Sequence, residues 1–146
     1  MTAAPLHREV ERRLVEHDVR YTRGRRAVVD ALADSPGPRS AAELVDTMDD
    51  PVPLSSLYRT LAVLEDSDVV VPHLATKGIA RYELAEWLTG HHHHFICTSC
   101  GAVEDIELAS ADEKDVDALV DRIAAGAGFV PTNHELEIAG LCRECA

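Results

Sequence analysis

The feature that most restricts how this chain can fold is a pair of Cys-x-x-Cys motifs, Cys97/Cys100 and Cys142/Cys145. A tight turn within each motif can direct both sulfurs to one point, so the two motifs together supply the four thiolates of a tetrahedral zinc site. Four sulfur ligands leave no position open for a substrate, which predicts a structural Zn(II) ion whose binding stabilises a small domain. Two disulfides are the alternative interpretation.

Length and composition limit the number of domains and indicate the cellular compartment in which the protein is expected. The 146 residues fit one ordinary domain or two small ones, and a hydrophobic fraction of 46% is sufficient for a packed core. The sequence has no run of 18 or more apolar residues and no basic-then-apolar leader, so we expect a cytoplasmic protein with no membrane partner. Thiols stay reduced in that compartment, which favours metal ligands over disulfides.

The net charge of −12 is unevenly distributed. Residues 1–82 carry 11 basic and 13 acidic residues, whereas residues 83–146 carry 3 basic and 13 acidic residues. Seven arginines lie within the first 26 residues. This asymmetry indicates two modules with different partners, and the basic end is suited to the phosphate backbone of double-stranded DNA.

The N-terminal half is predicted to be helical. An amphipathic helix is expected over Leu6–His17, and Thr22 is suited to cap a second helix that continues through Leu32. The segment Ser40–Glu43 is a capping box that begins a third helix. A fourth helix is expected to begin at Ser55 or Ser56, and short helices joined by tight turns are typical of a helix-turn-helix.

A two-stranded hairpin is expected after these helices. Val69–Val71 and Ala80–Leu84 are apolar or alternating segments on either side of a turn at Lys77-Gly78. A hairpin that follows a helix-turn-helix is called a wing, so residues 1–84 are predicted to form a winged helix-turn-helix DNA-binding domain. Residues 85–90 are interpreted as a hinge.

A second small module is predicted over residues 91–146. Strands are expected near His93–Ile96 and Val103–Glu107, followed by a helix that ends at Gly126 or Gly128. A final strand is expected to alternate its faces between His134 and Ile138 before it reaches Cys142. The whole chain is therefore assigned to the α+β class.

Polar residues near the start of the fourth helix have the character of a recognition helix, which contacts bases and phosphates with its N-terminal turns. The arginines at the start of the second helix are candidates for phosphate contacts. An ordinary solvated helix face would show a similar pattern, and the wing and the basic N-terminus favour DNA. The candidates are Arg23, Arg25, Arg26, Ser55, Ser56, Tyr58, Arg59 and Thr60.

Four consecutive histidines precede the first cysteine motif. In a strand, successive side chains point to opposite faces, so His91 and His93 would face one way while His92 and His94 face the other. One run can thereby contribute to two separate sites. A solvated loop is the alternative, and the position directly before Cys97 favours ligands.

With these motifs, the chain resembles the ferric-uptake-regulator (Fur) family of metal-sensing bacterial repressors along essentially its whole length. The segments that carry the resemblance are Tyr21–Arg26, Leu57–Leu61, Arg81–Leu84, His91–Gly101, Thr132–His134 and Cys142–Cys145. The resemblance implies a winged-helix domain, an α/β dimerisation domain and a homodimer. It also adds Tyr21 to the candidate DNA contacts.

The resemblance also implies two histidine-containing metal sites. The regulatory metal site of the family corresponds to Glu83, His92, His94 and Asp105, between the wing and the dimerisation module. An additional metal site corresponds to His91, His93, Asp117 and His134. Its carboxylate is ambiguous, because counting forward from Cys100 leads nearer to Asp112 than to Asp117.

The predicted function is a metal-responsive repressor in which a divalent ion acts as corepressor for metal-homeostasis genes. Nitrogen and oxygen ligands suit several ions; we favour Fe(II) or Zn(II), with Mn(II) and Ni(II) as further candidates. Many iron and peroxide sensors of the family have a histidine before the third helix, where this chain has Pro38 and Arg39. Zinc sensors often add a cysteine to this site, and none is available here. His73 in the wing is a candidate extra ligand.

Two other functions remain as alternatives. One is a peroxide-sensing regulator of the same family, for which the missing helix histidine is unfavourable. The other is a zinc-dependent hydrolase that activates water at a His/carboxylate site. The sequence contains no His-Glu-x-x-His segment, and the candidate ligands lie on both sides of a predicted hinge, so we expect no enzyme activity.

Overall fold

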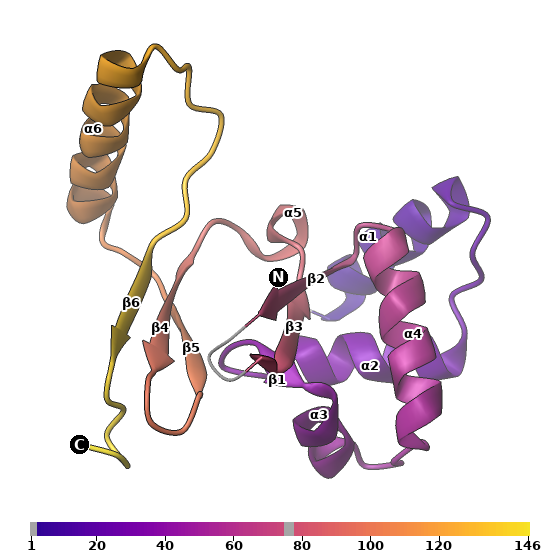
Figure 1. Ribbon diagram of the computed structural model, residues 1–146. Helices are drawn as coiled ribbons and strands as arrows, with labels where there is room; N and C mark the ends of the chain where they lie inside the picture. The colour runs from indigo at the N-terminus through magenta and orange to yellow at the C-terminus, as the bar shows by residue number, and fades with distance from the viewer. Residues whose placement is uncertain (1–2, 75–77) are drawn as a thin grey trace.

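The computed structural model describes residues 3–74 and 78–146, and it contains two modules that are each built on a three-stranded sheet (Figure 1). The N-terminal module is a winged helix-turn-helix, and the C-terminal module is a small α/β unit, so the predicted α+β class is confirmed. The elements of the first module are α1 (Ala3–Glu16), α2 (Arg23–Ala33), β1 (Arg39–Ser40), α3 (Ala41–Thr47), α4 (Leu54–Asp66), β2 (Val70–Leu74), β3 (Ala80–Leu84) and α5 (Glu86–Thr89).

Two predicted caps determine where α2 and α3 begin. The backbone N–H of Arg25 donates to Thr22 Oγ1 at 3.3 Å, which satisfies one of the free donors in the first turn of α2. At α3 the capping box is complete, because the N–H of Glu43 donates to Ser40 Oγ and the N–H of Ser40 donates to the Glu43 carboxylate. The buried Arg81 of β3 also donates to this carboxylate at 2.7 Å, so the cap joins α3 to the wing sheet.

Helix α4 packs its leucines into the core of the N-terminal module. It begins at Leu54, one residue before Ser55, the earlier of the two predicted starts, and its cap residue Pro53 makes no side-chain hydrogen bond. Leu57, Leu61 and Leu64 lie on one helical face and are fully buried. Full burial of a leucine contributes about 1.5–3 kcal/mol, so this stripe orients the opposite, polar face of α4 outward.

The wing sheet has the strand order β1-β3-β2, with all strands antiparallel. The expected hairpin is present, and the two-residue strand β1 is an addition that the sequence did not indicate. Its identity as a strand comes only from pairing with Arg81 and Tyr82 of β3. Of the predicted turn, Lys77 lies outside the described residues, and Gly78 has a φ of 72° that favours glycine.

A short helix occupies most of the segment that we expected to be a hinge. In α5, Leu88 is buried in the core of the N-terminal module, and Trp87 Nε1 donates to the carbonyl of Asp68 at 2.7 Å. The guanidinium of Arg13 lies over the Trp87 ring, 4.1 Å from its centroid. These contacts attach α5 to the N-terminal module, and the chain passes to the second module through Gly90, whose φ is 90°.

The C-terminal module has the strand order β5-β4-β6, in which β4 and β5 are antiparallel and β4 and β6 are parallel. Helix α6 lies in the connection between β5 and β6, which carries the chain from one edge of β4 to the other. Gly128 in the left-handed conformation ends α6, at one of the two predicted positions. The bounds are β4 (His93–Cys97), β5 (Val103–Ile106), α6 (Ser110–Ala127) and β6 (Glu137–Gly140).

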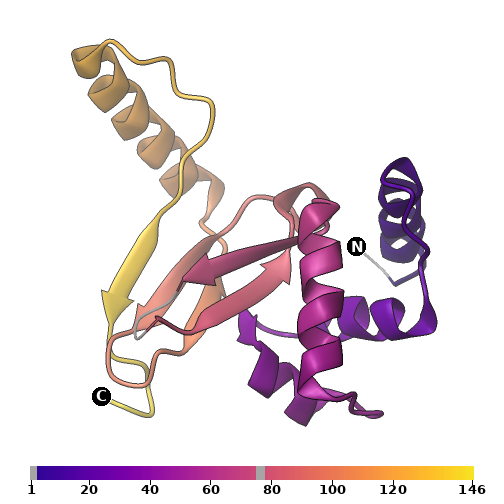
Figure 2. The same ribbon diagram turned by 45° about the vertical axis from the view of Figure 1, so that its right-hand side comes forward.

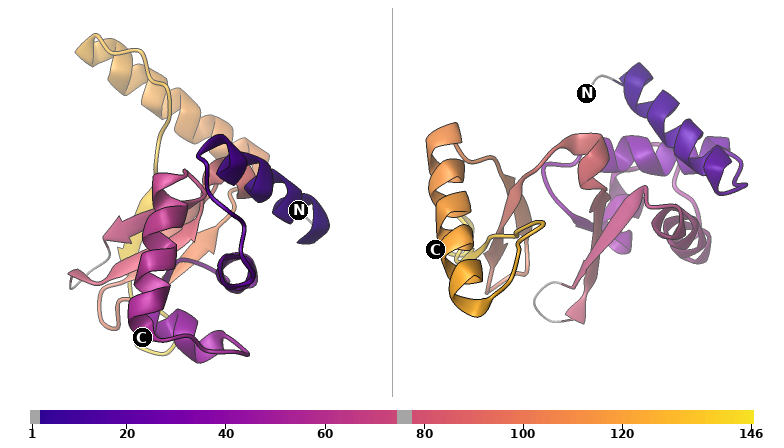
Figure 3. Two further views of the ribbon diagram at one scale, coloured as in Figure 1. Left: turned by 90° about the vertical axis from the view of Figure 1, so that its right-hand side faces the viewer. Right: turned by 90° about the horizontal axis from the view of Figure 1, so that it is seen from above.

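Helix α6 projects away from the rest of the chain. Figure 2 and the right-hand view of Figure 3 show it at the far end of the molecule from α1–α4, with the two sheets between them. Ala124 is the one residue of α6 that is buried. The final strand also differs from our prediction: it spans only Glu137–Gly140, and all four of its residues are exposed.

Across the described residues, no helix combines the length and apolar character needed to cross a bilayer.

Candidate metal centres and nucleic-acid interface

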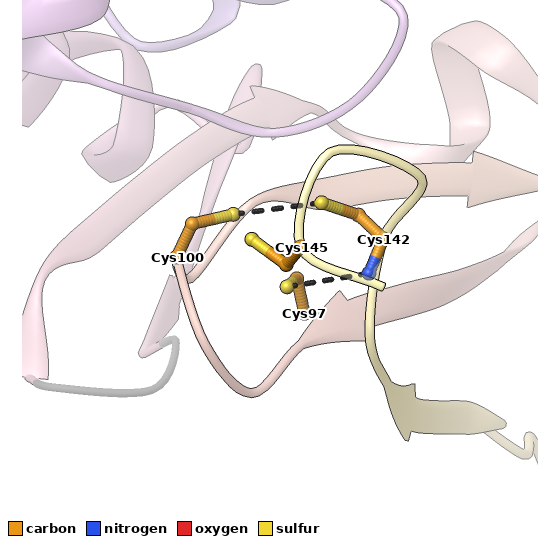
Figure 4. A group of neighbouring side chains, drawn as sticks. All are labelled: Cys97, Cys100, Cys142 and Cys145. Atoms are coloured by element: carbon orange, nitrogen blue, oxygen red, sulfur yellow. Dashed lines mark hydrogen bonds between the residues drawn. The ribbon is translucent and has the colours of Figure 1, made fainter.

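The four cysteines converge at the end of the C-terminal sheet (Figure 4). Cys97 is the last residue of β4 and Cys100 lies in the turn that follows, while Cys142 and Cys145 lie on the turn after β6. The first turn closes when the N–H of Gly101 donates to the carbonyl of Cys97, with Gly101 at a φ of 78°. All four are free thiols, so the disulfide alternative is not observed.

The cysteine cluster has the dimensions of a zinc site. Its four sulfurs lie within 4.8 Å of one another, and Cys100 Sγ is 3.8 Å from Cys142 Sγ. Zn–S bonds of about 2.3 Å in a tetrahedron place sulfurs about 3.8 Å apart. Hydrogen bonds from backbone N–H groups, first that of Cys100 and then that of Cys142, lower the pKa of the Cys97 thiol to about 6, which favours the thiolate that zinc requires.

A second group of potential ligands joins the two modules. We call it the hinge cluster, and it consists of Glu83, His92, His94 and Asp105. The Nε2 atoms of His92 and His94 lie 2.9 and 3.1 Å from Glu83 Oε2. Glu83 belongs to the wing strand β3, whereas the histidines precede or lie in β4. The structure therefore brings together all four residues of the predicted regulatory site.

The hinge cluster is held by opposite charges in a partly buried position. Burial alone would raise the pKa of Glu83. Hydrogen bonds from the imidazoles of His73, His92 and His94 outweigh this effect and hold the pKa of Glu83 well below its usual range. The hydrogen bond to Glu83 in turn raises the pKa of His92 to about 9. Burial raises the pKa of Asp105. Protonated His92 therefore places a positive charge beside these carboxylates.

A third group lies where β4 meets the start of α6. We call it the α6 cluster, and it consists of His91, His93, Glu113 and His134. Glu113 Oε1 lies 2.8 Å from His134 Nε2, and Glu113 Oε2 lies 3.0 Å from His93 Nε2. Burial alone would raise the pKa of Glu113, but its hydrogen bonds to these two histidines lower it. All residues of this cluster belong to the C-terminal module.

The carboxylate of the α6 cluster is not the one we selected from the sequence. Glu113 contacts three histidines, whereas Asp117 reaches only His134 Nδ1 at 3.5 Å, and neither Asp117 nor Asp112 belongs to the cluster found among the described residues. Glu113 and Asp117 are one turn apart on the same face of α6. Their position on one helical face could be predicted from the sequence. The sequence alone did not show which of the two carboxylates would contact the histidines.

A direct backbone contact accompanies the hinge cluster. The N–H of Asp105 donates to the carbonyl of Pro36 at 3.2 Å, which links the α2–α3 loop to β5. Gly37 in this loop is buried against β5, where a Cβ would lie 2.5 Å from the carbonyl oxygen of Val103. The segment that precedes α3 therefore touches the second module through backbone atoms.

The predicted DNA contacts lie on α4 and at the start of α2. Tyr58 and Arg59 are exposed on the face of α4 opposite its buried leucines, and Ser55 is also exposed, whereas Ser56 and Thr60 are half-buried. Arg23 is exposed, and Arg25 and Arg26 are half-buried. The structure gives these residues positions that permit DNA contact, and their roles stay predictions.

Tyr21 differs from the other candidate DNA contacts because its side chain makes contacts within the N-terminal module. Its hydroxyl is 2.6 Å from His7 Nδ1, whose Nε2 is 2.7 Å from Asp30. Arg26 lies over the Tyr21 ring, and burial raises the pKa of the phenol. These internal contacts indicate that Tyr21 positions Arg26 and the start of α2.

Comparison with known sequences identifies the relatives. The sequence model of the ferric uptake regulator family matches residues 16–139. The chain is 30% identical over 141 residues to the ferric uptake regulation protein of Bacillus subtilis, covering 93% of this chain and 91% of that protein. It is 29% identical over 137 residues to the peroxide operon regulator of the same species, covering 91% and 88%.

Comparison with solved structures also finds metal uptake regulators. The Helicobacter pylori ferric uptake regulator superposes with a TM-score of 0.76 at 23% identity, covering 99% of this chain and 94% of that one, which shows the shared fold. A zinc uptake regulator in complex with zinc and DNA superposes with a TM-score of 0.58 at 26% identity, covering 99% and 95%. The chain belongs to the ferric uptake regulator family of metal-responsive transcription regulators.

Proposed function

We propose that this protein is a homodimeric repressor whose affinity for an operator is controlled by a divalent ion held in the hinge cluster. The observation that carries the proposal is the contact of Glu83, from the wing, with His92 and His94 of the second module. Residues of two modules that share one ligand set bind an ion best in one relative arrangement. Ion binding then favours the population with that arrangement.

The residues of the three clusters have separate proposed roles. The four cysteines would hold a structural Zn(II) ion that joins the turn after β4 to the C-terminal turn. The hinge cluster would hold the regulatory ion, for which nitrogen and oxygen donors suit Fe(II), Zn(II) or Mn(II). The α6 cluster would hold an additional ion within the second module. A divalent ion supplies positive charge that relieves repulsion between its carboxylate ligands.

Exposed apolar side chains support the dimer. Helix α6 and the strand and loops beside it leave large hydrophobic residues uncovered in the protomer, as expected of an interface surface. These residues are Leu119, Ile123, Phe129, Val130, Ile138 and Leu141. A twofold dimer built on this surface would present two α4 helices, whose separation must match two half-sites on DNA.

The decisive experiment removes the contact between the modules. The double variant Glu83→Ala, His92→Ala should retain its fold and its structural zinc but lose metal-dependent operator binding, measured by fluorescence anisotropy across buffered metal concentrations. The matched control is Glu113→Ala, His134→Ala, which removes a similar pair within the second module only. Metal-dependent binding that survives in the first variant would show that the regulatory ion is bound elsewhere.

Peroxide sensing is a second candidate function, favoured by the similarity to the peroxide operon regulator. Peroxide treatment of the iron-loaded protein should then abolish operator binding while the manganese-loaded protein stays active. Equal resistance of both forms would leave metal sensing as the function. The named relatives are regulators, and we propose no enzyme activity for this chain.

A further inference from the structure

His73 lies beside the hinge cluster on the second strand of the wing. In the β2–β3 register, His73 is opposite Arg81, and Val71 is opposite Glu83, so His73 and Glu83 are diagonal neighbours on one face of the sheet. His73 Nε2 lies 2.6 Å from Glu83 Oε1. The His73 ring meets the ring of His94 edge-on, with centroids 4.9 Å apart.

Three imidazoles therefore surround one carboxylate. His73 approaches Oε1 of Glu83, while His92 and His94 approach Oε2, all through Nε2. The side chain of His73 is only 20% exposed. A divalent ion with three neutral imidazoles and the carboxylates of Glu83 and Asp105 makes a ligand set with no net charge, which suits a partly buried position.

The rest of the N-terminal module offers no side-chain ligand at this point among the described residues. The α2–α3 loop reaches β5 through the backbone of Pro36 and through Gly37. On the far side, an oxygen of Glu137 from β6 lies within 4.8 Å of ligand nitrogens of His73 and His94. The wing is therefore the part of the N-terminal module from which the histidine and carboxylate ligands come.

We propose that His73 is a ligand of the regulatory ion, so that both wing strands hold it and the set becomes three imidazoles and two carboxylates. This inference rests on the proposed regulatory role of the hinge cluster. Five protein ligands suit ions that accept five or six donors, such as Mn(II) and Fe(II), better than tetrahedral Zn(II). His73 thus biases the site toward these ions.

The experiment must separate a ligand from a residue that only orients Glu83, because loss of an orienting partner also reduces metal affinity about 10–100-fold. We would compare His73→Ala with His73→Gln, whose amide N–H can still donate to Glu83 but whose nitrogen does not bind metal. Both variants would be made with Glu113→Ala and His134→Ala, so that the α6 cluster does not contribute. Mn(II) and Zn(II) affinities would be measured by competition with chelators.

If His73 is a ligand, both substitutions reduce Mn(II) affinity more than tenfold and reduce Zn(II) affinity less. In the Co(II)-loaded protein, the number of hyperfine-shifted imidazole N–H proton resonances falls from three to two. His7→Gln is the matched control, because His7 is also half-buried and bonded to a carboxylate, Asp30. It should leave both measurements unchanged.

Two results would overturn the inference. One is a His73→Gln variant with the metal affinities of the parent protein, and the other is an unchanged number of shifted imidazole resonances; either would make His73 a positioning residue. His92→Ala, measured in parallel, distinguishes the two proposals. If His92→Ala loses metal and the His73 variants do not, only the role of His73 is wrong; if neither loses metal, the regulatory site itself is misplaced.

Discussion

At the scale of single residues, protons and metal ions compete for the hinge cluster. His92 has its pKa raised to about 9 mainly by the hydrogen bond to Glu83. A raised pKa in the folded state means that the protonated imidazole stabilises the metal-free fold. That contribution is complete below the unfolded value of about 6.5 and is lost as the pH rises through about 9.

His92→Gln should therefore lower the melting temperature of the protein that contains structural zinc but no regulatory ion. We expect the largest difference from the parent protein near pH 6.5 and almost none at pH 10, because the imidazole is then neutral in both states. Calorimetry at several pH values measures this. A difference that grows with pH would contradict the assigned charge state.

Substitution of Arg59 tests whether the polar face of α4 contacts DNA. It is exposed on the side opposite the buried leucines, so Arg59→Ala should not change the free energy of unfolding by more than about 0.5 kcal/mol. If Arg59 reads a base, operator affinity should fall by about 1–3 kcal/mol at one base position. If it contacts phosphate, the loss is similar on all sequences and the salt dependence becomes shallower. Unchanged binding to every sequence would remove Arg59 from the interface.

At the scale of elements, the contact of the α2–α3 loop with β5 leaves no room for a side chain. Gly37→Ala would place a Cβ 2.5 Å from the Val103 carbonyl, so the loop and the strand must separate. Overpacking of this kind costs about 1–3 kcal/mol. The clash destabilises the arrangement of the two modules that ion binding favours. We therefore expect the variant to bind the operator more weakly at saturating metal, as measured by fluorescence anisotropy.

Gly126→Ala is the control for this substitution. Gly126 lies in α6, and a Cβ added there would meet no atom within 4 Å beyond its own helical turn, so alanine should stabilise the helix by up to about 1 kcal/mol. Because Gly126 is three residues after Ile123 on the proposed dimer surface, sedimentation velocity first establishes that the variant is dimeric, and its operator binding should then be unchanged. If Gly37→Ala binds the operator as tightly as Gly126→Ala, the loop contact has no role in the DNA-binding arrangement.

The C-terminal turn depends on the cysteine cluster. Cys142→Ser should release the proposed structural zinc and loosen β6, because it removes one of the four sulfurs that would hold the C-terminal turn against the end of β4. Zinc content by elemental analysis and hydrogen exchange of β4 and β6 measure both effects. Arg143→Ser, a change in the same turn that removes no sulfur, should alter neither. A zinc-free Cys142→Ser protein with native exchange rates would refute the structural role.

At the scale of the whole molecule, the proposed dimer is built on the exposed apolar surface of the C-terminal module. Ile123 of α6 is 64% exposed in the protomer, so Ile123→Asp should convert the proposed dimer to a monomer by placing a charge in the interface. Sedimentation velocity measures this. Operator affinity should fall at the same time, since one recognition helix replaces two.

Val15→Asp is the matched control, because Val15 is 66% exposed on α1 at the other end of the molecule. We expect it to remain dimeric. Dimers of Ile123→Asp that are as stable as those of Val15→Asp would place the interface on another surface.

Local sequence was sufficient to specify the features that depend on a few neighbouring residues. Thr22 and the Ser40–Glu43 box set helix starts, and the Cys-x-x-Cys spacing brings each sulfur pair together. His92 and His94 belong to one cluster and His91 and His93 to the other, as side-chain alternation predicted, although only His93 and His94 lie within β4. These geometries arise within one or two turns or one strand, so bonding between near neighbours in the chain is enough to produce them.

Which distant groups meet was settled by the packing of the elements in three dimensions. Glu113 takes the position expected for Asp117 because the docking angle of α6, not sequence spacing, determines which carboxylate reaches the histidines. The same holds for the contact of Gly37 with β5 and for the approach of His73 to Glu83. Each depends on how two packed elements are placed, and that placement results from the sum of many weak contacts that no short segment of sequence contains.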